Sequence, residues 1–247
     1  MIKLNKWDTT KSMCGIFFNY HSKRSKDQDV LQCGYKLKHR GPTSSTVKQF
    51  DYNNGDLVTM VFHRLSIMGI SDGDQPFFSD GVYVMCNGEI YNYKEIIDEY
   101  KLNVKTHSDC EVIFAYYKTI DASSDKHLKL TQFLSNLRGE FAFIIFDTRT
   151  SCIFAGRDRC GVRPLFFNYE FYSFTFASEL KGIPGGKGTQ IEPDKCHKFD
   201  INNSVFTSLS YFRLVSKLSY KDALIRAVDE RLKSEAPIGF LLSGGFD

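Results

Sequence analysis

Cys14 is the residue whose position best suits covalent chemistry, because it lies between Met13 and Gly15, directly ahead of the apolar run 16–18. A cysteine that becomes the first residue of a chain carries a nucleophilic thiol. Its own α-amine, with a pKa of about 8, is then a base that accepts the thiol proton, and no histidine is required. Taken alone, a free cysteine in such a place is more often a small buried hydrophobic residue of an edge strand. The chemistry of Cys14 therefore depends on whether residues 1–13 are removed.

Further polar residues could contribute to a binding site, and each also has a purely structural interpretation. Asn87 and Gly88 offer a side-chain amide and a backbone N–H, but the pair alone is typical of a type I′ hairpin turn. Arg64 could hold a carboxylate through two hydrogen bonds or form an ordinary surface ion pair. Asp109 could bind an ammonium group or be an acidic residue in the first turn of a helix. Their joint occurrence is more informative than any one of them.

A candidate anion site lies near the end of the sequence. The short apolar segment 238–242 is expected to form a strand that runs into Ser-Gly-Gly-Phe-Asp at 243–247. Backbone N–H groups of such a turn can hold an anion when a helix follows. By contrast, the glycine-rich stretch 182–188 does not indicate a Walker loop, because Lys181 stands where that motif requires a glycine.

Composition narrows the class of protein. The chain has 247 residues, 42% hydrophobic and 25% charged, enough for one large core or a domain and part of another. Its net charge is only +3 and its basic residues are scattered, so we expect no nucleic-acid partner. The longest apolar segments, such as 141–146, are too short to span a membrane. The seven cysteines include no Cys-x-x-Cys pair and no zinc spacing, so we expect no metal site and a cytoplasmic location.

The elements expected around these residues are mainly strands. Short segments rich in β-branched and aromatic residues, bounded by Gly, Asp or Asn, indicate buried strands at 16–20, 58–62, 82–86, 141–146 and 153–155. Residues 172–176 alternate aromatic and hydroxyl side chains, as does one arm of an antiparallel hairpin.

Helices are expected at 27–38, at 109–118 with Ser108 as N-cap, and after Ser219, ending before Pro237. Sheet faces as apolar as these need cover on both sides. The sequence therefore predicts an α+β fold, in which antiparallel sheets form a sandwich with helices outside.

Short motifs follow one another in a fixed order along residues 14–247. They are Cys14-Gly15-Ile16-Phe17, His39-Arg40-Gly41-Pro42, His63-Arg64-Leu65-Ser66-Ile67, Gln75-Pro76, Asn87-Gly88-Glu89-Ile90-Tyr91-Asn92-Tyr93, His107-Ser108-Asp109, Leu137-Arg138-Gly139-Glu140-Phe141-Ala142-Phe143, Gly156-Arg157-Asp158-Arg159 and Pro164-Leu165. In this order they resemble the class II glutamine amidotransferases, and within them the glutamine-hydrolysing asparagine synthetase family. The resemblance implies the four-layer α/β/β/α sandwich of N-terminal nucleophile hydrolases over 14–200.

The resemblance also implies roles in glutamine hydrolysis. Cys14 would attack the side-chain amide of L-glutamine to give a thioester and ammonia, with its freed amine as base and no cofactor. Asn87 and Gly88 would bind the oxyanion. Arg64 would hold the substrate α-carboxylate. Glutamine would further contact Ile67, Met68, Glu89 and Asp109, of which the two acidic residues would hold the α-ammonium group.

For residues 201–247 the resemblance implies a linker and the truncated start of an α/β ATP pyrophosphatase domain. There ATP and Mg²⁺ would be bound at Leu242, Ser243, Gly244, Gly245 and Asp247. In the family this domain adenylates L-aspartate, which ammonia then converts to asparagine, and members are often homodimers. The chain as written could therefore hydrolyse glutamine but lacks the aspartate site.

Two features depart from the family pattern. Residues 1–13 precede Cys14. Either Met13 is the true start and is then removed, or residues 1–13 are a leader or propeptide whose removal frees the Cys14 amine. Thr43 follows Arg-Gly-Pro where an aspartate is common, which affects only local loop contacts. If the leader stays, the alternative is a catalytically silent domain that keeps the fold and binds glutamine or a partner chain.

Overall fold

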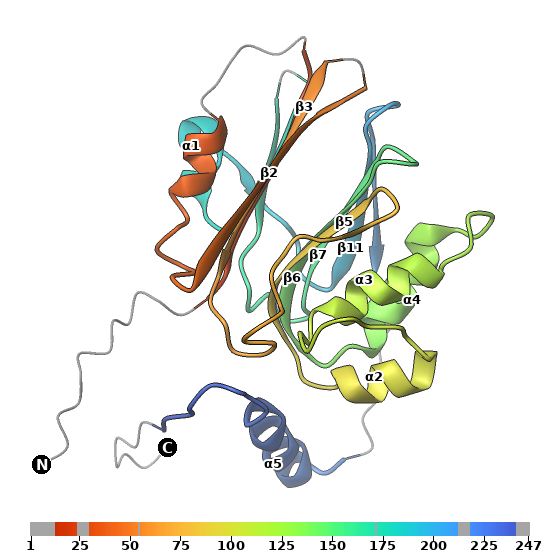
Figure 1. The fold of residues 1–247 in the computed structure, drawn as a ribbon. Coiled ribbons are helices and arrows are strands. Elements are labelled where there is room, and N and C mark those ends of the chain that lie inside the picture. Colours follow the sequence, from red (N-terminus) through yellow and green to blue (C-terminus); the bar gives the residue numbers. More distant parts are fainter. Residues whose placement is uncertain (1–12, 24–29, 54, 171, 212–217, 241–247) are drawn as a thin grey trace, which may run out of the picture.

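The computed structural model describes residues 13–23, 30–53, 55–170, 172–211 and 218–240. Two six-stranded sheets lie face to face, and helices cover their outer faces (Figure 1). Helix α1 (Val30–Tyr35) lies on one sheet, whereas α2 (Tyr93–Tyr100), α3 (Glu111–Thr119) and α4 (Lys126–Asn136) lie on the other. Helix α5 (Tyr220–Arg231) lies at one end of the sandwich. The four-layer α+β sandwich expected from the sequence is confirmed.

Every strand pair in both sheets is antiparallel. The first sheet has the order β10 (Thr189–Gln190), β8 (Phe166–Glu170), β9 (Ser173–Ala177), β1 (Gly15–His21), β3 (Asp56–Arg64) and β2 (Ser44–Tyr52). The second has the order β12 (Val205–Ser210), β11 (Lys195–Asp200), β7 (Cys152–Arg157), β6 (Gly139–Asp147), β5 (Val82–Ile90) and β4 (Phe77–Ser79). The short 3₁₀ turns η1 (Leu180–Gly182) and η2 (Pro184–Gly186) lie in the glycine-rich stretch.

Each interface between layers has its own hydrophobic core. Side chains alternate along β1, so Ile16 and Phe18 pack between the two sheets while Phe17 packs under α1. In the second sheet, Ile144 likewise faces the other sheet, and Phe143 faces the helices. Because both of their faces are buried, β1, β3, β5 and β6 are nearly continuous apolar runs rather than alternating ones.

Several sequence predictions are confirmed. The five strands expected from apolar segments form parts of β1, β3, β5, β6 and β7, and β8 and β9 form the hairpin expected at 172–176. Ser219 caps α5, accepting a hydrogen bond from the backbone N–H of Asp222. The structure also contains elements that the sequence patterns do not predict, including β2, β11, β12, α2 and α4.

Two local expectations are wrong, and one structural alternative is excluded. That alternative is the hairpin turn at Asn87 and Gly88, because both residues pair with β6 inside the long strand β5. Cys110, not Ser108, is the N-cap of α3, and it makes no side-chain capping hydrogen bond. Of the strand predicted at 238–242, residues 238–240 are not in a strand, and residues 241 and 242 lie outside the described residues. Helix α1 covers residues 30–35 of the predicted 27–38, of which 27–29 lie outside the described residues.

Candidate active site

Cys14 immediately precedes β1, at the sheet end where β3 finishes. Gly15 pairs with His63, so Cys14 lies next to Arg64 and Leu65. The Leu65 N–H donates to the Cys14 Sγ at 3.2 Å, and the Arg40 Nε donates to the Cys14 carbonyl at 2.9 Å. Two hydrogen bonds therefore fix the backbone and the sulfur of this residue.

The thiol of Cys14 is a weak acid in this structure. Burial raises its pKa to about 11, although the Leu65 N–H acts in the opposite direction. Little thiolate is present at neutral pH, so attack requires a nearby base. Within the sequence given, the Cys14 nitrogen is in a peptide bond with Met13, and both residues line one cavity between strand ends and loops.

Asn87 and Gly88 lie in β5 opposite the first residues of β6. The Asn87 side chain is buried, and its Nδ2 has no hydrogen-bond partner among the described residues. An unpaired buried amide costs about 1–3 kcal/mol, and because Asn87 lines the same cavity as Cys14, its N–H donor is available to a ligand there. At Gly88, φ is +155°, and a Cβ would lie 2.0 Å from the Glu140 carbonyl oxygen. Only glycine allows β5 and β6 to approach this closely.

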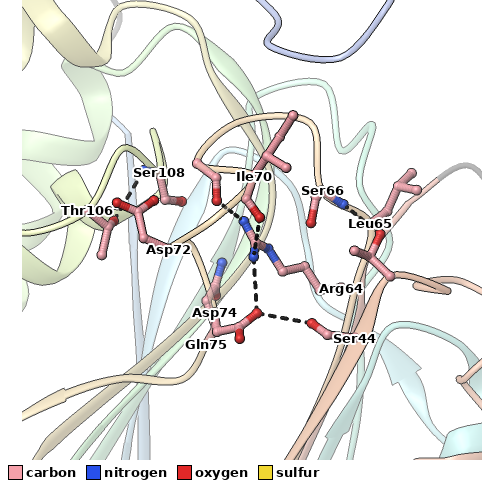
Figure 2. Close-up of polar contacts among 12 residues, drawn as sticks. Ser44, Arg64, Leu65, Ser66, Ile70, Asp72, Asp74, Gln75, Thr106 and Ser108 are labelled. Carbon is pink, nitrogen blue, oxygen red and sulfur yellow. Dashed lines mark hydrogen bonds and ion pairs between the residues drawn. The ribbon is translucent and has the colours of Figure 1, made fainter.

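Arg64 is the last residue of β3, and its guanidinium is wrapped by the loop that follows. Its Nη2 donates to the carbonyls of Met68, at 3.3 Å, and Gly69. Its Nη1 donates to the Ile70 carbonyl at 3.4 Å and to Asp74 Oδ1 at 3.1 Å (Figure 2). The side chain is only 7% exposed. Arg64 is thus a buried cation held rigidly at the wall of the cavity.

Asp109 and Glu89 provide negative charge at another wall. Asp109 Oδ2 accepts a hydrogen bond from the Ile90 N–H. Burial, followed by the charge of Glu89, raises the pKa of Asp109 to about 7. The pKa of Glu89 is also raised by burial, against the attraction of Arg163, which lies 3.8 Å away. Two carboxyl groups with raised pKa values in one cavity suit an ammonium group, which restores their charge.

One cavity brings together every residue predicted for the glutamine step. It is lined by Cys14, Arg64, Ile67, Met68, Asn87, Gly88, Glu89 and Asp109. They come from strand ends and loops separated by up to 95 residues of sequence. The antiparallel pairing of β1 with β3 places Cys14 beside Arg64, and the packing of the two sheets against each other brings both close to β5.

The same cavity is also lined by Gln75 and Arg163, for which the sequence predicts no role. Gln75 Nε2 donates to the Cys86 carbonyl at 3.1 Å, and Gln75 Oε1 accepts from the Cys86 N–H at 2.6 Å, so it joins the Arg64 loop to β5. Arg163 faces both Glu89 and Glu140, at 3.8 and 3.7 Å. Gln75 belongs to a motif quoted above, and Arg163 directly precedes another. These motifs are the features of the sequence that could have pointed to a role for the two residues.

The predicted ATP residues Leu242, Ser243, Gly244, Gly245 and Asp247 lie outside the described residues. Within the described ranges, no group of three or more His, Cys, Asp or Glu side chains could hold a metal ion. No helix there is long and apolar enough to cross a membrane.

Residues 13–233 match the family described as the glutamine amidotransferase domain. The chain belongs to this family. Among curated proteins, this amidotransferase domain is 32% identical over 95% of its length to a probable glutamine-hydrolyzing asparagine synthetase of Acanthamoeba polyphaga mimivirus, covering 48% of it. It is 31% identical to the Asparagus officinalis asparagine synthetase, covering 40%, and 29% identical to Escherichia coli asparagine synthetase B, covering 43%. The chain thus spans about half the length of these relatives.

Solved structures confirm the fold of the amidotransferase domain. The Bacillus subtilis glutamine phosphoribosylpyrophosphate amidotransferase complexed with ADP and GMP superimposes with a TM-score of 0.60 at 18% identity, covering 82% of this chain and 50% of that one. A structure titled as the allosteric regulatory enzyme of purine biosynthesis superimposes with a TM-score of 0.65, with the same identity and coverage.

Proposed function

We propose that this chain is the glutamine-hydrolysing part of an asparagine synthetase. The observation that carries the proposal is the cavity in which Cys14 lies beside the unpaired Asn87 amide, with Arg64 and the Asp109–Glu89 pair on its walls. A cation and two acids in one cavity match the α-carboxylate and α-ammonium groups of a free amino acid. L-Glutamine satisfies both and presents its side-chain amide to the thiol.

In the proposed reaction, the freed α-amine of Cys14 takes the thiol proton, and the sulfur attacks the glutamine side-chain carbonyl carbon. The oxyanion that forms accepts hydrogen bonds from Asn87 Nδ2 and the Gly88 N–H. Its collapse breaks the C–N bond, and the protonated amine gives its proton to the departing ammonia. Water then attacks the thioester, releasing glutamate and restoring the thiol.

For the whole protein we propose that the released ammonia serves the ATP-dependent amidation of L-aspartate, as the names of the curated relatives suggest. The binding of ATP and Mg²⁺ at Leu242, Ser243, Gly244, Gly245 and Asp247, and the formation of any homodimer, stay predictions. The seven cysteines are all free, which favours work in a reducing compartment such as the cytoplasm.

The test is ammonia release from glutamine, measured together with the mass and N-terminal sequence of the active protein. We expect activity only from protein that begins at Cys14, and Cys14→Ala should abolish it while calorimetry still detects glutamine binding. Cys160→Ala, at an exposed cysteine, is the matched control and should keep full activity. Turnover by protein that retains Met13 would contradict the mechanism.

A silent domain is the second candidate, and two observations favour it. In the sequence given, the Cys14 nitrogen is acylated by Met13, and the thiol pKa is raised rather than lowered. If the mature protein keeps residues 1–13, glutamine binding without ammonia release is the expected result.

A further inference from the structure

Asp74 lies directly on the cation that is proposed to hold the substrate carboxylate. Its Oδ1 is 3.1 Å from Arg64 Nη1, and the Ser44 hydroxyl donates to the same oxygen at 3.0 Å (Figure 2). The two partners differ strongly in exposure, because the Arg64 side chain is 7% exposed and that of Asp74 is 63% exposed. The exposed carboxylate of Asp74 thus forms an ion pair with the buried guanidinium of Arg64 at the border of the proposed glutamine cavity.

Arg64 does not need Asp74 to stay in place. The carbonyls of Met68, Gly69 and Ile70 already accept hydrogen bonds from both Nη atoms. Gly73 packs against the guanidinium so closely that a Cβ there would lie 2.5 Å from Nη2. Three carbonyls and this close backbone contact fix the position of the cation, so the main contribution of Asp74 is its charge.

That charge opposes substrate binding. A carboxylate at hydrogen-bond distance cancels much of the field of Arg64 where a second carboxylate must approach, and like charges repel. Asp74 also accepts a hydrogen bond from Nη1, one of the two donors that bidentate binding of a substrate carboxylate requires. A substrate carboxylate must therefore displace Asp74 or share the cation with it.

We propose that Asp74 is a specificity-determining residue that acts as an internal carboxylate on Arg64 and weakens the binding of the α-carboxylate of glutamine. The proposal rests on the proposed function, because it takes Arg64 to be the carboxylate site. It assigns to this chain a lower affinity for glutamine than the same cavity would have without the charge at residue 74.

The test is Asp74→Asn, which removes the charge but keeps an oxygen that can accept from Arg64 and Ser44. In the form of the enzyme that releases ammonia from glutamine, we expect the KM for glutamine to fall about 3- to 10-fold, with kcat within about twofold. Asp72→Asn is the matched control, because Asp72 carries the same charge on the same loop but bonds to His107 rather than to Arg64. Its effect on KM should be under about twofold.

A binding measurement shows which group of the substrate is involved. In the Cys14→Ala full chain, Asp74→Asn should tighten glutamine binding about 3- to 10-fold by calorimetry. It should leave unchanged the affinity for 4-aminobutanamide, which is glutamine without its α-carboxylate. An unchanged or raised KM, or equal tightening of both ligands, overturns the role of Asp74. Absence of ammonia release from the unsubstituted enzyme would instead overturn the proposed function, so the two failures are distinguishable.

Discussion

At the scale of single residues, Asp109 has an ionisation state that neutral pH can change. Its side chain is buried and accepts a hydrogen bond from the Ile90 N–H. Burial, together with the nearby charge of Glu89, raises the pKa of Asp109 to about 7. Below that pH the carboxyl group is mainly neutral and offers no charge to an ammonium group. Above it the group is ionised and available.

Glutamine affinity should therefore fall as pH decreases through about 7, by up to about tenfold per pH unit. Calorimetry with the Cys14→Ala chain at several pH values between about 5.5 and 8.5 measures this directly, because the Cys14 amine plays no part in binding. Asp109→Asn should bind weakly at every pH and lose most of the dependence. An affinity that stays constant across this range in the chain with Asp109 intact would contradict the assignment.

At the scale of elements, the segment after α5 is attached to the loop that holds Arg64. The Glu235 N–H donates to the Ile67 carbonyl at 3.1 Å, and the Glu235 carboxylate accepts from the Ile70 N–H at 3.1 Å. The end of α5 itself is tied to β6 by the ion pair of Arg231 with Glu140. A movement of α5 would therefore reach the cavity that contains Cys14 through one loop.

Glu235→Ala should raise the KM for glutamine by about 2- to 5-fold, because the loop whose carbonyls position Arg64 loses one anchor. The Ile70 amide should also exchange its hydrogen faster, which hydrogen exchange measured by mass spectrometry would report. Asp229→Ala, on the exposed surface of α5, is the control and should change neither quantity. Unchanged exchange at Ile70 would show that the anchor does not restrain the loop.

At the scale of the whole molecule, Asp147 joins the second sheet to its helix layer. Its fully buried carboxylate, at the end of β6, accepts from Tyr117 of α3 at 2.9 Å and from Lys126 of α4 at 2.8 Å. Arg149 adds a further ion pair at 2.8 Å. Burial alone would raise the pKa of Asp147, but hydrogen bonds from Arg149, Lys126 and Tyr117 outweigh it and hold the pKa well below its usual range.

Asp147→Ala should lower the free energy of unfolding by about 3–5 kcal/mol at pH 7, because the largely buried ammonium group of Lys126 loses its carboxylate partner. Since the pKa in the folded state is depressed, the stabilisation is present above the unfolded pKa of about 3.9 and is lost as pH falls below it. Urea denaturation of both proteins at pH 7 and near pH 3 should show the difference narrowing at low pH. Asp51→Ala, on the half-exposed strand β2, is the control. A constant difference would exclude the ionic contribution.

Much of the architecture was predictable because buried strands require runs of apolar residues, which are visible in the local sequence. The apolar runs of β1, β3, β5 and β6 are continuous since both faces of each sheet are covered, and Ser219 marks the start of α5 through its own capping bond. Strand β2 was missed because it lies at a sheet edge, where its exposed charged residues follow no apolar pattern.

Asn87 and Gly88 mark the limit of local reasoning. The pair has the composition of a turn, yet it lies within β5, because pairing with β6 outweighs local turn preference. Only the contact with Glu140 explains why residue 88 must be glycine.

The sequence by itself determined the sandwich, the family and the residues that gather around Cys14, because residue types and motif order are local properties of the chain. Only the tertiary structure decided the ion pairs, pKa values and hydrogen-bond partners of those residues. The occupation of Arg64 by Asp74, the raised pKa of Asp109 and the unpaired Asn87 amide all arise from distances between segments far apart in sequence. Electrostatic energy depends on distance and burial, and neither is encoded in local order.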